Sequence, residues 1–152
     1  MLMLLFQLDR SQYAIPAIEV VEVAPLVRLQ PLSMAPDFIT GLFNYRGQHV
    51  PVIDLCKLIA GRFSENSITT RIILVQFRRT DGQSDILGLL AEQVTETISL
   101  DTDNFLSTGI TLPDAPFLGK AAHTESGLIQ QVNIEHLLPD PVKALLYPAE
   151  TA

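Results

Sequence analysis

The residues of this chain best suited to chemistry are three histidines and a single cysteine. His49, His123 and His136 lie far apart, and none stands at metal-ligand spacing from another histidine or from Cys56. The sequence also contains no His-x-x-x-His, Cys-x-x-Cys or Gly-x-x-x-x-Gly-Lys motif. We therefore expect no catalytic residues, no cofactor and no bound metal, and we do not expect an enzyme.

Each of these residues has an ordinary structural interpretation. His49 follows the polar Gln48 and is expected to face solvent, and Cys56 is expected to be a small core residue rather than a nucleophile. Glu92 and Glu96 are close enough to lie near one another, but single acids in β-rich segments are usually solvated. None of these groups predicts a reaction.

Bulk composition narrows the class of protein. The chain has 152 residues, of which 47% are hydrophobic, so we expect one folded domain rather than disorder. Ten basic and 17 acidic side chains give a formal charge of −7, which argues against nucleic acid and anionic membranes as partners. A single cysteine fits a reducing cytoplasm. The apolar start, residues 1–6, lacks a basic flank and is too short to insert into a membrane, so we expect a first strand.

The stretch from Gly41 to Leu55 is the part of the chain around which the rest is organised. Its pattern predicts a strand, a tight turn at Arg46-Gly47, a second strand and the start of a helix. Gly47 supplies the positive φ that such a turn needs. Pro51 cannot donate to a ladder and marks an edge or the end of pairing. Asp54 is expected to cap the helix by accepting from the free amides of Cys56 or Lys57.

The remaining pattern predicts about ten short strands with small accessory helices, and hence an all-β barrel or sandwich. Periodicity alone does not divide the strands into lobes. The expected strands are 2–8, 13–15, 20–23, 27–32, 71–77, 86–90, 94–100, 117–123 and 128–132, in addition to the central pair. The other expected features are a helical turn at 37–40, a helix over 54–60 ended by Gly61, a mobile connection over 62–70, an exposed hairpin loop over 78–85 with Asp-Gly at its tip, a loop over 101–116, and two late helices capped by Asn133 and Asp140.

Four segments, in order, resemble the CheW domain, the coupling module of bacterial chemosensory arrays. The central one is Asn44-x-Arg46-Gly47-x-x-x-Pro51-Val52-Ile53-Asp54-Leu55. Residues 13–16 and 20–23 resemble the opening strand pair of that family, residues 88–96 its second-lobe motif, and residues 132–138 its closing segment. The resemblance covers nearly the whole chain. It implies a single domain over 1–152, made of two intertwined five-stranded SH3-like β-barrels with a groove between them.

The resemblance also implies a function and a set of partners. It describes a non-enzymatic adaptor that couples chemoreceptors to a CheA-type histidine kinase. One face would bind the regulatory domain of the kinase, the groove would bind the cytoplasmic tip of a methyl-accepting chemoreceptor, and other CheW-like proteins are further partners. Such a protein works in the cytoplasm, at receptor arrays on the inner face of the membrane. The chain starts at its first strand and shows no receiver domain, so we expect a stand-alone coupler.

The resemblance assigns roles to particular residues. From composition alone Arg46 is a solvated turn residue, but by resemblance it belongs to the coupling surface, where a guanidinium can pair with a carboxylate of a partner helix. Asn44 either shares that surface or bonds the backbone of its own turn. Tyr45 joins them, and Leu29 and Leu32 are half-exposed anchors or, equally well, core residues. The structural residues are Gly41, Gly47, Pro51 and Asp54 around the hairpin. The second-lobe motif contributes Gly88, Glu92 and Val94, and the apolar residues around it are likewise either partner contacts or core.

Two departures from the family pattern and two other functions stay open. Ser33 stands where many members have proline, and Glu92 replaces a common aspartate, which adds one methylene to any bond made there. A small β-barrel that binds a metabolite between its lobes would have the same composition. So would a structural subunit that self-associates through edge strands.

Overall fold

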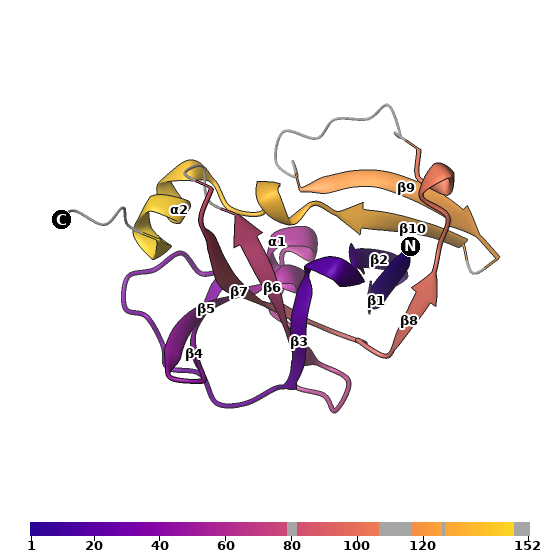
Figure 1. Cartoon of the computed structure of the whole chain (residues 1–152). Coiled ribbons are helices and arrows are strands. Elements are labelled where there is room, and N and C mark those ends of the chain that lie inside the picture. The colour runs from indigo at the N-terminus through magenta and orange to yellow at the C-terminus, as the bar shows by residue number, and fades with distance from the viewer. Residues whose placement is uncertain (79–81, 107–116, 126, 148–152) are drawn as a thin grey trace.

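The computed structural model describes residues 1–78, 82–106, 117–125 and 127–147, which form ten strands and a few short helices (Figure 1). The strands are β1 (Leu2–Leu8), β2 (Ser11–Pro16), β3 (Val20–Pro25), β4 (Ile39–Tyr45), β5 (Gln48–Asp54), β6 (Arg71–Arg78), β7 (Ser84–Ala91), β8 (Glu96–Ser99), β9 (Leu118–Thr124) and β10 (Gly127–Val132). The helices are α1 (Leu55–Ala60) and α2 (Asp140–Leu146), with 3-10 turns η1 (Ala17–Glu19), η2 (Thr102–Asn104) and η3 (Ile134–His136).

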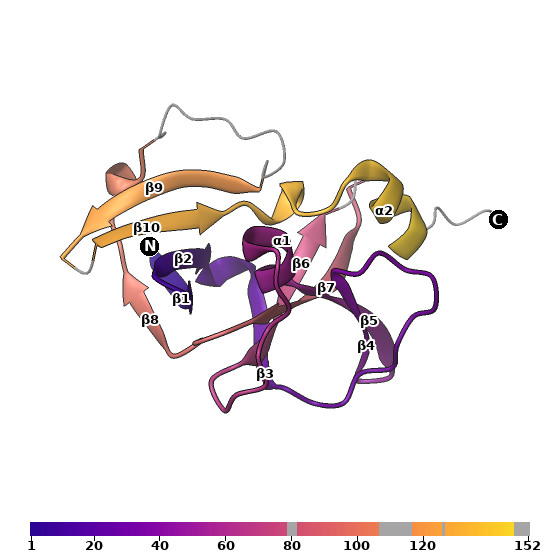
Figure 2. The same cartoon turned by 180° about the vertical axis from the view of Figure 1, so that it is seen from behind.

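The strands form two five-stranded sheets, which we call lobe A and lobe B. Lobe A has the order β8-β1-β2-β10-β9, and lobe B has the order β3-β6-β7-β5-β4. Lobe A takes its strands from both ends of the chain, whereas lobe B is built from the middle (Figures 1 and 2). The chain therefore leaves lobe A after β2 and returns to it at β8. The predicted all-β fold of two intertwined five-stranded lobes is confirmed.

Strand β6 shows how the two lobes are held together. Ile72 and Leu74 point into the interior of lobe B, while Ile73, Val75 and Phe77 point into a larger apolar cluster shared by both lobes. Alternate side chains of a strand face opposite sides of the sheet, so a strand buried on both sides needs a continuous apolar run. The shared core also takes Leu4, Phe6 and Leu8 of β1, whereas Met3 and Leu5 fill the separate core of lobe A.

The central hairpin and the Gly88 motif lie in the same lobe. Strand β5 pairs in parallel with β7, with Val52 opposite Gly88. A Cβ atom at Gly88 would lie 2.8 Å from Cγ2 of Val52 and 3.3 Å from Cγ2 of Ile72, so the position requires glycine. Of residues 88–96, those up to Ala91 lie in β7 of lobe B, and only Glu96 enters lobe A, at the start of β8. Strands β2 and β3 likewise belong to different lobes.

The prediction of a strand over 27–32 is wrong. Only Gln30 makes a strand-like bridge there, donating to the carbonyl of Leu42 at 3.0 Å and accepting from its amide at 2.7 Å. Pro25 and Pro31 lack amide protons, which limits pairing on either side. Of residues 37–40, the first two form a turn, not a helix, and the last two already belong to β4. The carbonyl of Phe38 accepts from the amide of Asp54 at 2.7 Å, a tertiary contact that local sequence does not show.

Smaller corrections concern the late segments. Strand β8 covers only Glu96–Ser99 of the expected 94–100. Asn133 stands at the start of η3 without capping it through its side chain. Pro139, not Asp140, holds the cap position of α2, and the Asp140 carboxylate instead lies 3.6 Å from the Lys143 ammonium. The expected loop tip at 79–81, most of the 101–116 loop and residues 148–152 lie outside the described residues. None of the described helices is long and apolar enough to cross a membrane.

Candidate partner-binding surface

The tip of the β4–β5 hairpin is a two-residue turn at Arg46 and Gly47. Their φ angles are 50° and 84°, so both residues are left-handed, as a type I′ hairpin turn requires. The Oδ1 atom of Asn44 accepts a hydrogen bond from the amide of Gly47 at 3.2 Å. The predicted turn is confirmed, and so is the predicted hydrogen bond between the Asn44 side chain and the backbone of the turn. Arg46 was not expected to be left-handed, and this conformation is uncommon for a residue with a side chain.

The side chain of Arg46 is exposed and packs against the ring of its neighbour Tyr45. Its guanidinium carbon lies 5.1 Å from the centre of the Tyr45 ring, and that ring stacks on Phe43 at 6.3 Å. No described acidic residue lies within ion-pair distance of the guanidinium. The Glu22 carboxylate of β3, by accepting a hydrogen bond from the phenol, raises the pKa of Tyr45. The Tyr45 ring thus supports an exposed cation at the tip of the hairpin.

Leu29 and Leu32 lie beside this hairpin in the irregular segment that precedes β4. Leu29 packs against the core of lobe B and Leu32 against the shared core, and both are half-buried. Gly41 lets this segment approach β4, because a Cβ atom there would lie 2.5 Å from the carbonyl oxygen of Gln30. Both leucines combine packing with partial exposure.

Pro51 stands within β5, which is an inner strand and not an edge. Its antiparallel partner is Leu42, whose amide and carbonyl both face Gln30. Leu42 and Pro51 therefore form a non-hydrogen-bonded pair, in which the backbone groups of the two residues point away from each other. The amide position of Pro51 faces β7, just before the parallel pairing begins at Val52. Pro51 therefore marks neither an edge nor the end of the β4–β5 pairing, and it lies only at the limit of the β5–β7 pairing.

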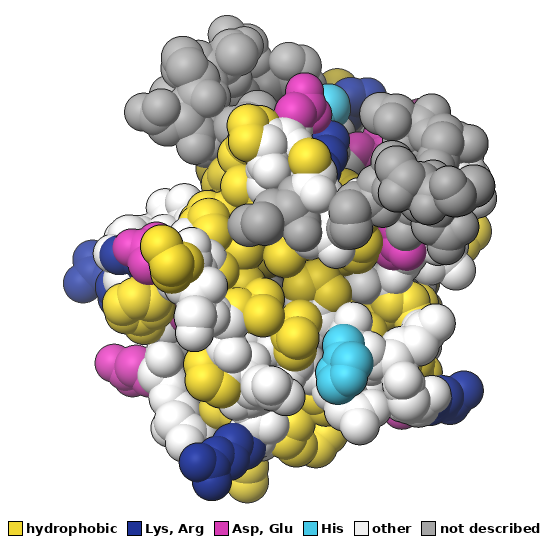
Figure 3. Space-filling view, turned by 90° about the vertical axis from the view of Figure 1, so that its left-hand side faces the viewer, with side chains coloured by type: hydrophobic (Ala, Val, Ile, Leu, Met, Phe, Trp, Pro, Cys, Tyr) yellow, Lys and Arg dark blue, Asp and Glu magenta, His cyan; other side chains and the backbone are white. Residues whose placement is uncertain are grey.

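The face that carries β4, β5 and α2 gathers apolar side chains over its centre, with basic and acidic side chains toward its edges (Figure 3). A shallow pocket of about 270 Å³ lies on lobe B against α2, lined by Gln48, His49, Val50, Pro51, Asp85, Ile86, Leu146 and Tyr147. A second pocket, of about 310 Å³, is lined by residues of lobe A such as Gln12 and Leu128. Neither lies between the lobes, where a metabolite site was considered.

Asp54 caps α1 as predicted and also binds Ser64 in the segment that follows the helix. Its Oδ1 atom accepts from the amides of Cys56 at 3.0 Å and Lys57 at 3.4 Å. The same carboxylate also accepts from the amide of Ser64 at 2.9 Å and from its hydroxyl at 2.6 Å. The helix ends at Gly61, which has a φ of 76°. A buried carboxylate with four donors is both a helix cap and an anchor for the segment that follows.

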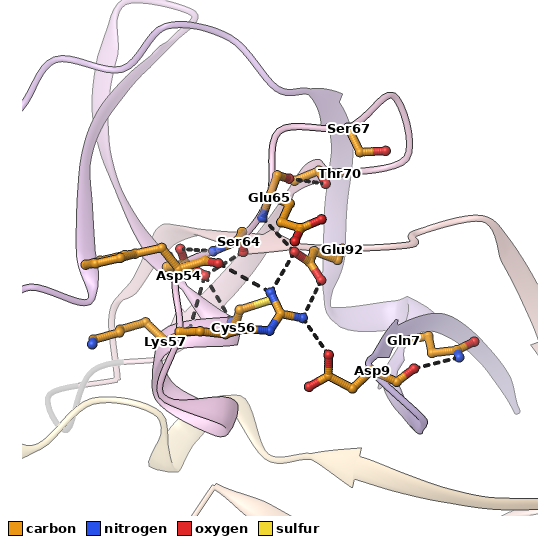
Figure 4. A network of polar contacts seen from close by, with 12 residues as sticks. Gln7, Asp9, Asp54, Cys56, Lys57, Ser64, Glu65, Ser67, Thr70 and Glu92 are labelled. Atoms are coloured by element: carbon orange, nitrogen blue, oxygen red, sulfur yellow. Dashed lines mark hydrogen bonds and ion pairs between the residues drawn. The ribbon is translucent and has the colours of Figure 1, made fainter.

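Glu92 is buried, in contrast to the solvated acid that we expected. It is 7% exposed, and its oxygens accept from the Arg62 guanidinium at 2.8 and 3.0 Å (Figure 4). Arg62 also reaches the carboxylate of Asp9 at 3.0 Å, which joins the β1–β2 turn of lobe A to the end of β7 in lobe B. Hydrogen bonds from Arg62 hold the pKa of Glu92 below its usual range. Val94 is buried just beyond.

The groups considered for chemistry behave as structural residues. Cys56 is fully buried, and burial raises the pKa of its thiol to about 11, so it is not a thiolate nucleophile at neutral pH. His49 is exposed, as expected. Across the described residues, no group of three or more metal-ligating side chains comes together.

Arg62 and Ser64 are the site residues that sequence reasoning missed. They lie in a polar connection that we expected to be mobile, and no local pattern marks them. A signal was present at Glu92, which directly follows the apolar run of β7. A carboxylate at the end of a buried strand is costly to bury unless a cation pairs with it. The sequence therefore predicts that Glu92 has a cationic partner but does not identify that partner.

Together these features define a class of protein: a rigid two-lobed β-domain with an exposed arginine on a preformed hairpin tip. The sequence pattern that defines the CheW-like domain matches residues 2–142, so the chain belongs to the CheW-like domain family.

Known relatives agree with this assignment. The chemotaxis protein CheW of Klebsiella aerogenes is 32% identical over 149 residues, covering 94% of this chain and 84% of the relative. CheW of Treponema pallidum is 25% identical over 129 residues, covering 83% and 71%. Among solved structures, the scaffolding protein TtCheW of Thermoanaerobacter tengcongensis superposes with a TM-score of 0.79 at 27% identity, covering 93% of this chain and 90% of that one.

Proposed function

We propose that this chain is a chemotaxis adaptor that holds a chemoreceptor and a CheA-type histidine kinase in a fixed relative geometry. The observation that carries the proposal is the family match over residues 2–142, supported by relatives named chemotaxis protein CheW and a structural neighbour named a scaffolding protein. An adaptor or scaffold role in chemotaxis follows from that membership. The identity of the two partners is the further step.

The two-lobed body suits a coupling role because it is stiff. The shared core joins the lobes through buried side chains of β1, β5, β6 and β7. Close-packed interiors resist deformation and transmit displacement, so a partner held on one lobe is fixed relative to a partner on the other. A small receptor movement can then bias the kinase between states of different activity, provided the two states bind the adaptor differently.

On the receptor side, the proposed contact is the hairpin tip. The type I′ turn and the Tyr45 ring hold Arg46 outward, and a guanidinium can pair with both oxygens of a carboxylate on a partner helix. Asn44 contributes by fixing the turn, and Leu29 and Leu32 supply apolar contact through their exposed parts. Apolar contact would provide affinity, and Arg46 would set register and choice of receptor.

On the kinase side, we propose lobe-to-lobe packing with the regulatory domain, and with other CheW-like proteins in the array. Such contacts place the protein in the cytoplasm, at receptor arrays. The direct test is binding of a purified cognate regulatory domain, for which we expect association at tens of micromolar or tighter, a range usual for modular contacts. Absence of association in that range would count against the proposal.

The receptor contact has its own test in Arg46→Glu. We expect this variant to lose most of its binding to the receptor tip, since the introduced carboxylate repels the one it should pair with. Its melting temperature should stay close to that of the parent protein, because the side chain is exposed. If melting collapses while the remaining folded fraction binds normally, Arg46 is structural and the assignment is wrong.

A further inference from the structure

The segment over residues 62–70, which we call the strap, uses the buried polar side chains of the molecule. Asp54, Thr70 and Glu92 are the polar or charged residues that are buried among those described. All three bond within the strap or to it. Burying a carboxylate costs several kcal/mol unless hydrogen bonds from the protein replace those it made with water. The fold therefore commits its costly buried groups to fixing one irregular segment.

The bonds are distributed along the whole strap. Near its start, Arg62 reaches Glu92, and the amide of Glu65 donates to the same carboxylate at 2.6 Å. Near its end, the hydroxyl of Thr70 donates to the carbonyl of Glu65 at 2.7 Å, and the carbonyl of Thr69 accepts from the amide of Val94 at 3.0 Å. Ser64 adds its two bonds to the cap of α1. The strap is fixed at both ends and in its middle.

What this rigid strap displays is apolar. Phe63 is 58% exposed and Ile68 is 92% exposed, although the residues around them are bonded to the body. The ammonium of Lys57 lies 4.8 Å from the centre of the Phe63 ring and supports it from the side of α1. Ile68 stands at a turn closed by the amide of Thr70 and the carbonyl of Ser67, at 3.1 Å. Apolar side chains held in place before binding lose little entropy when a partner covers them.

The charge around the strap indicates the chemistry of that partner. The guanidinium of Arg62 faces the carboxylates of Asp9 and Glu92, and Glu65 adds an exposed carboxylate with no cation near it among the described residues. Because Arg62 pairs with the buried Glu92, the exposed carboxylates of Asp9 and Glu65 leave an acidic rim. The ammonium of Lys57 is balanced by its contact with Asp37 at 3.6 Å. A second copy of this acidic chain would bring like charges together, which disfavours self-association here.

We propose that the strap is a second protein-binding surface, which docks a partner whose apolar pocket is rimmed by lysine or arginine. Phe63 and Ile68 would enter the pocket, and the acidic rim would face the basic one. This surface is separate from the hairpin tip, since the strap is anchored to Asp54 at one end of β5 and the tip adjoins the other end of that strand. The inference does not depend on which receptor or kinase the hairpin surface serves.

The test is photocrosslinking in cells of the source organism. Benzoylphenylalanine at position 63 of the full chain should give one dominant adduct that is absent when the same probe replaces the exposed Thr97 of β8. Mass spectrometry of the adduct should place the crosslink in an apolar segment flanked by basic residues. Adding Ile68→Ser or Glu65→Lys should lower the adduct yield by about tenfold or more, the size of one good contact on the affinity scale.

Several results would overturn the inference. They are no adduct at position 63, the same adducts at positions 63 and 97, an adduct with a second copy of the chain, or an unchanged yield with Glu65→Lys. Arg62→Ala tests whether rigidity matters: it leaves the buried Glu92 without its cation and should destabilise the protein, and it should lower the yield severalfold even when the yield is normalised to the folded fraction. An unchanged yield with Arg62→Ala would show that the strap is not preorganised for binding. Arg46→Glu should leave the strap adduct intact, which separates this surface from the proposed receptor contact.

Discussion

The hairpin tip and the strap are both exposed, irregular segments, yet they are held in opposite ways. At the tip, residues 44–47 fix themselves through backbone conformation and one bond between near neighbours. In the strap, residues 62–70 are fixed by carboxylates that lie up to 53 positions away. A partner meets a preformed surface in both cases.

This difference predicts which substitutions reduce binding and which reduce stability at each surface. The tip depends on a few residues that contribute little to global stability, so changes there should affect binding more than folding. The strap depends on buried charges, so changes to its anchors should affect folding and the surface together. Three substitutions test this difference between the two surfaces.

Asp54→Ala should have the largest effect. It removes the cap of α1, worth about 1 kcal/mol, and leaves the amide and hydroxyl of Ser64 without their acceptor, for a total near 3 kcal/mol. Urea unfolding would measure this free energy. Asp37→Ala is the matched control, because its carboxylate is exposed, and it should cost no more than about 0.5 kcal/mol. A cost for Asp54→Ala near 1 kcal/mol would mean that the strap bonds add nothing.

Glu92→Gln should cost about 2 kcal/mol at neutral pH, because Arg62 loses a charged partner. The folded-state pKa of Glu92 lies below the ordinary value of 4.5. Its contribution is therefore complete above pH 4.5 and is lost as the pH falls through the lower folded pKa. Unfolding curves of parent and variant should converge in acid, whereas Glu96→Gln, an exposed control, should show no such convergence. A gap that stays constant down to pH 3 would contradict the assignment.

Arg46→Gly should have the smallest effect on stability. Glycine accepts a φ of 50° without the cost of about 1 kcal/mol that a side chain incurs, and this gain offsets the greater freedom of the unfolded chain. The free energy of unfolding should change by less than about 1 kcal/mol, while receptor binding should fall as in Arg46→Glu. A loss well above 1 kcal/mol would show that the Arg46 side chain supports the hairpin.

The sequence by itself determined much of the local structure. The Arg46-Gly47 turn, the Asn44 bond and the Asp54 cap involve residues within four positions of one another, so their chemistry is visible in order along the chain. The continuous apolar run of β6 predicted a strand buried on both faces. The ordered motifs also identified the family and its two-lobed fold.

Only the tertiary structure decided which strands share a lobe and which acids are buried. Gly88 lies in the lobe of the hairpin because β7 pairs with β5, and no local pattern specifies that pairing. Glu92 is buried because Arg62 reaches it across 30 positions of sequence. Hydrogen bonds and charge pairs act over a few ångströms in space, whatever the separation along the chain. A polar segment therefore gives the same sequence signal whether it is solvated or fixed, and the folded neighbours decide between the two.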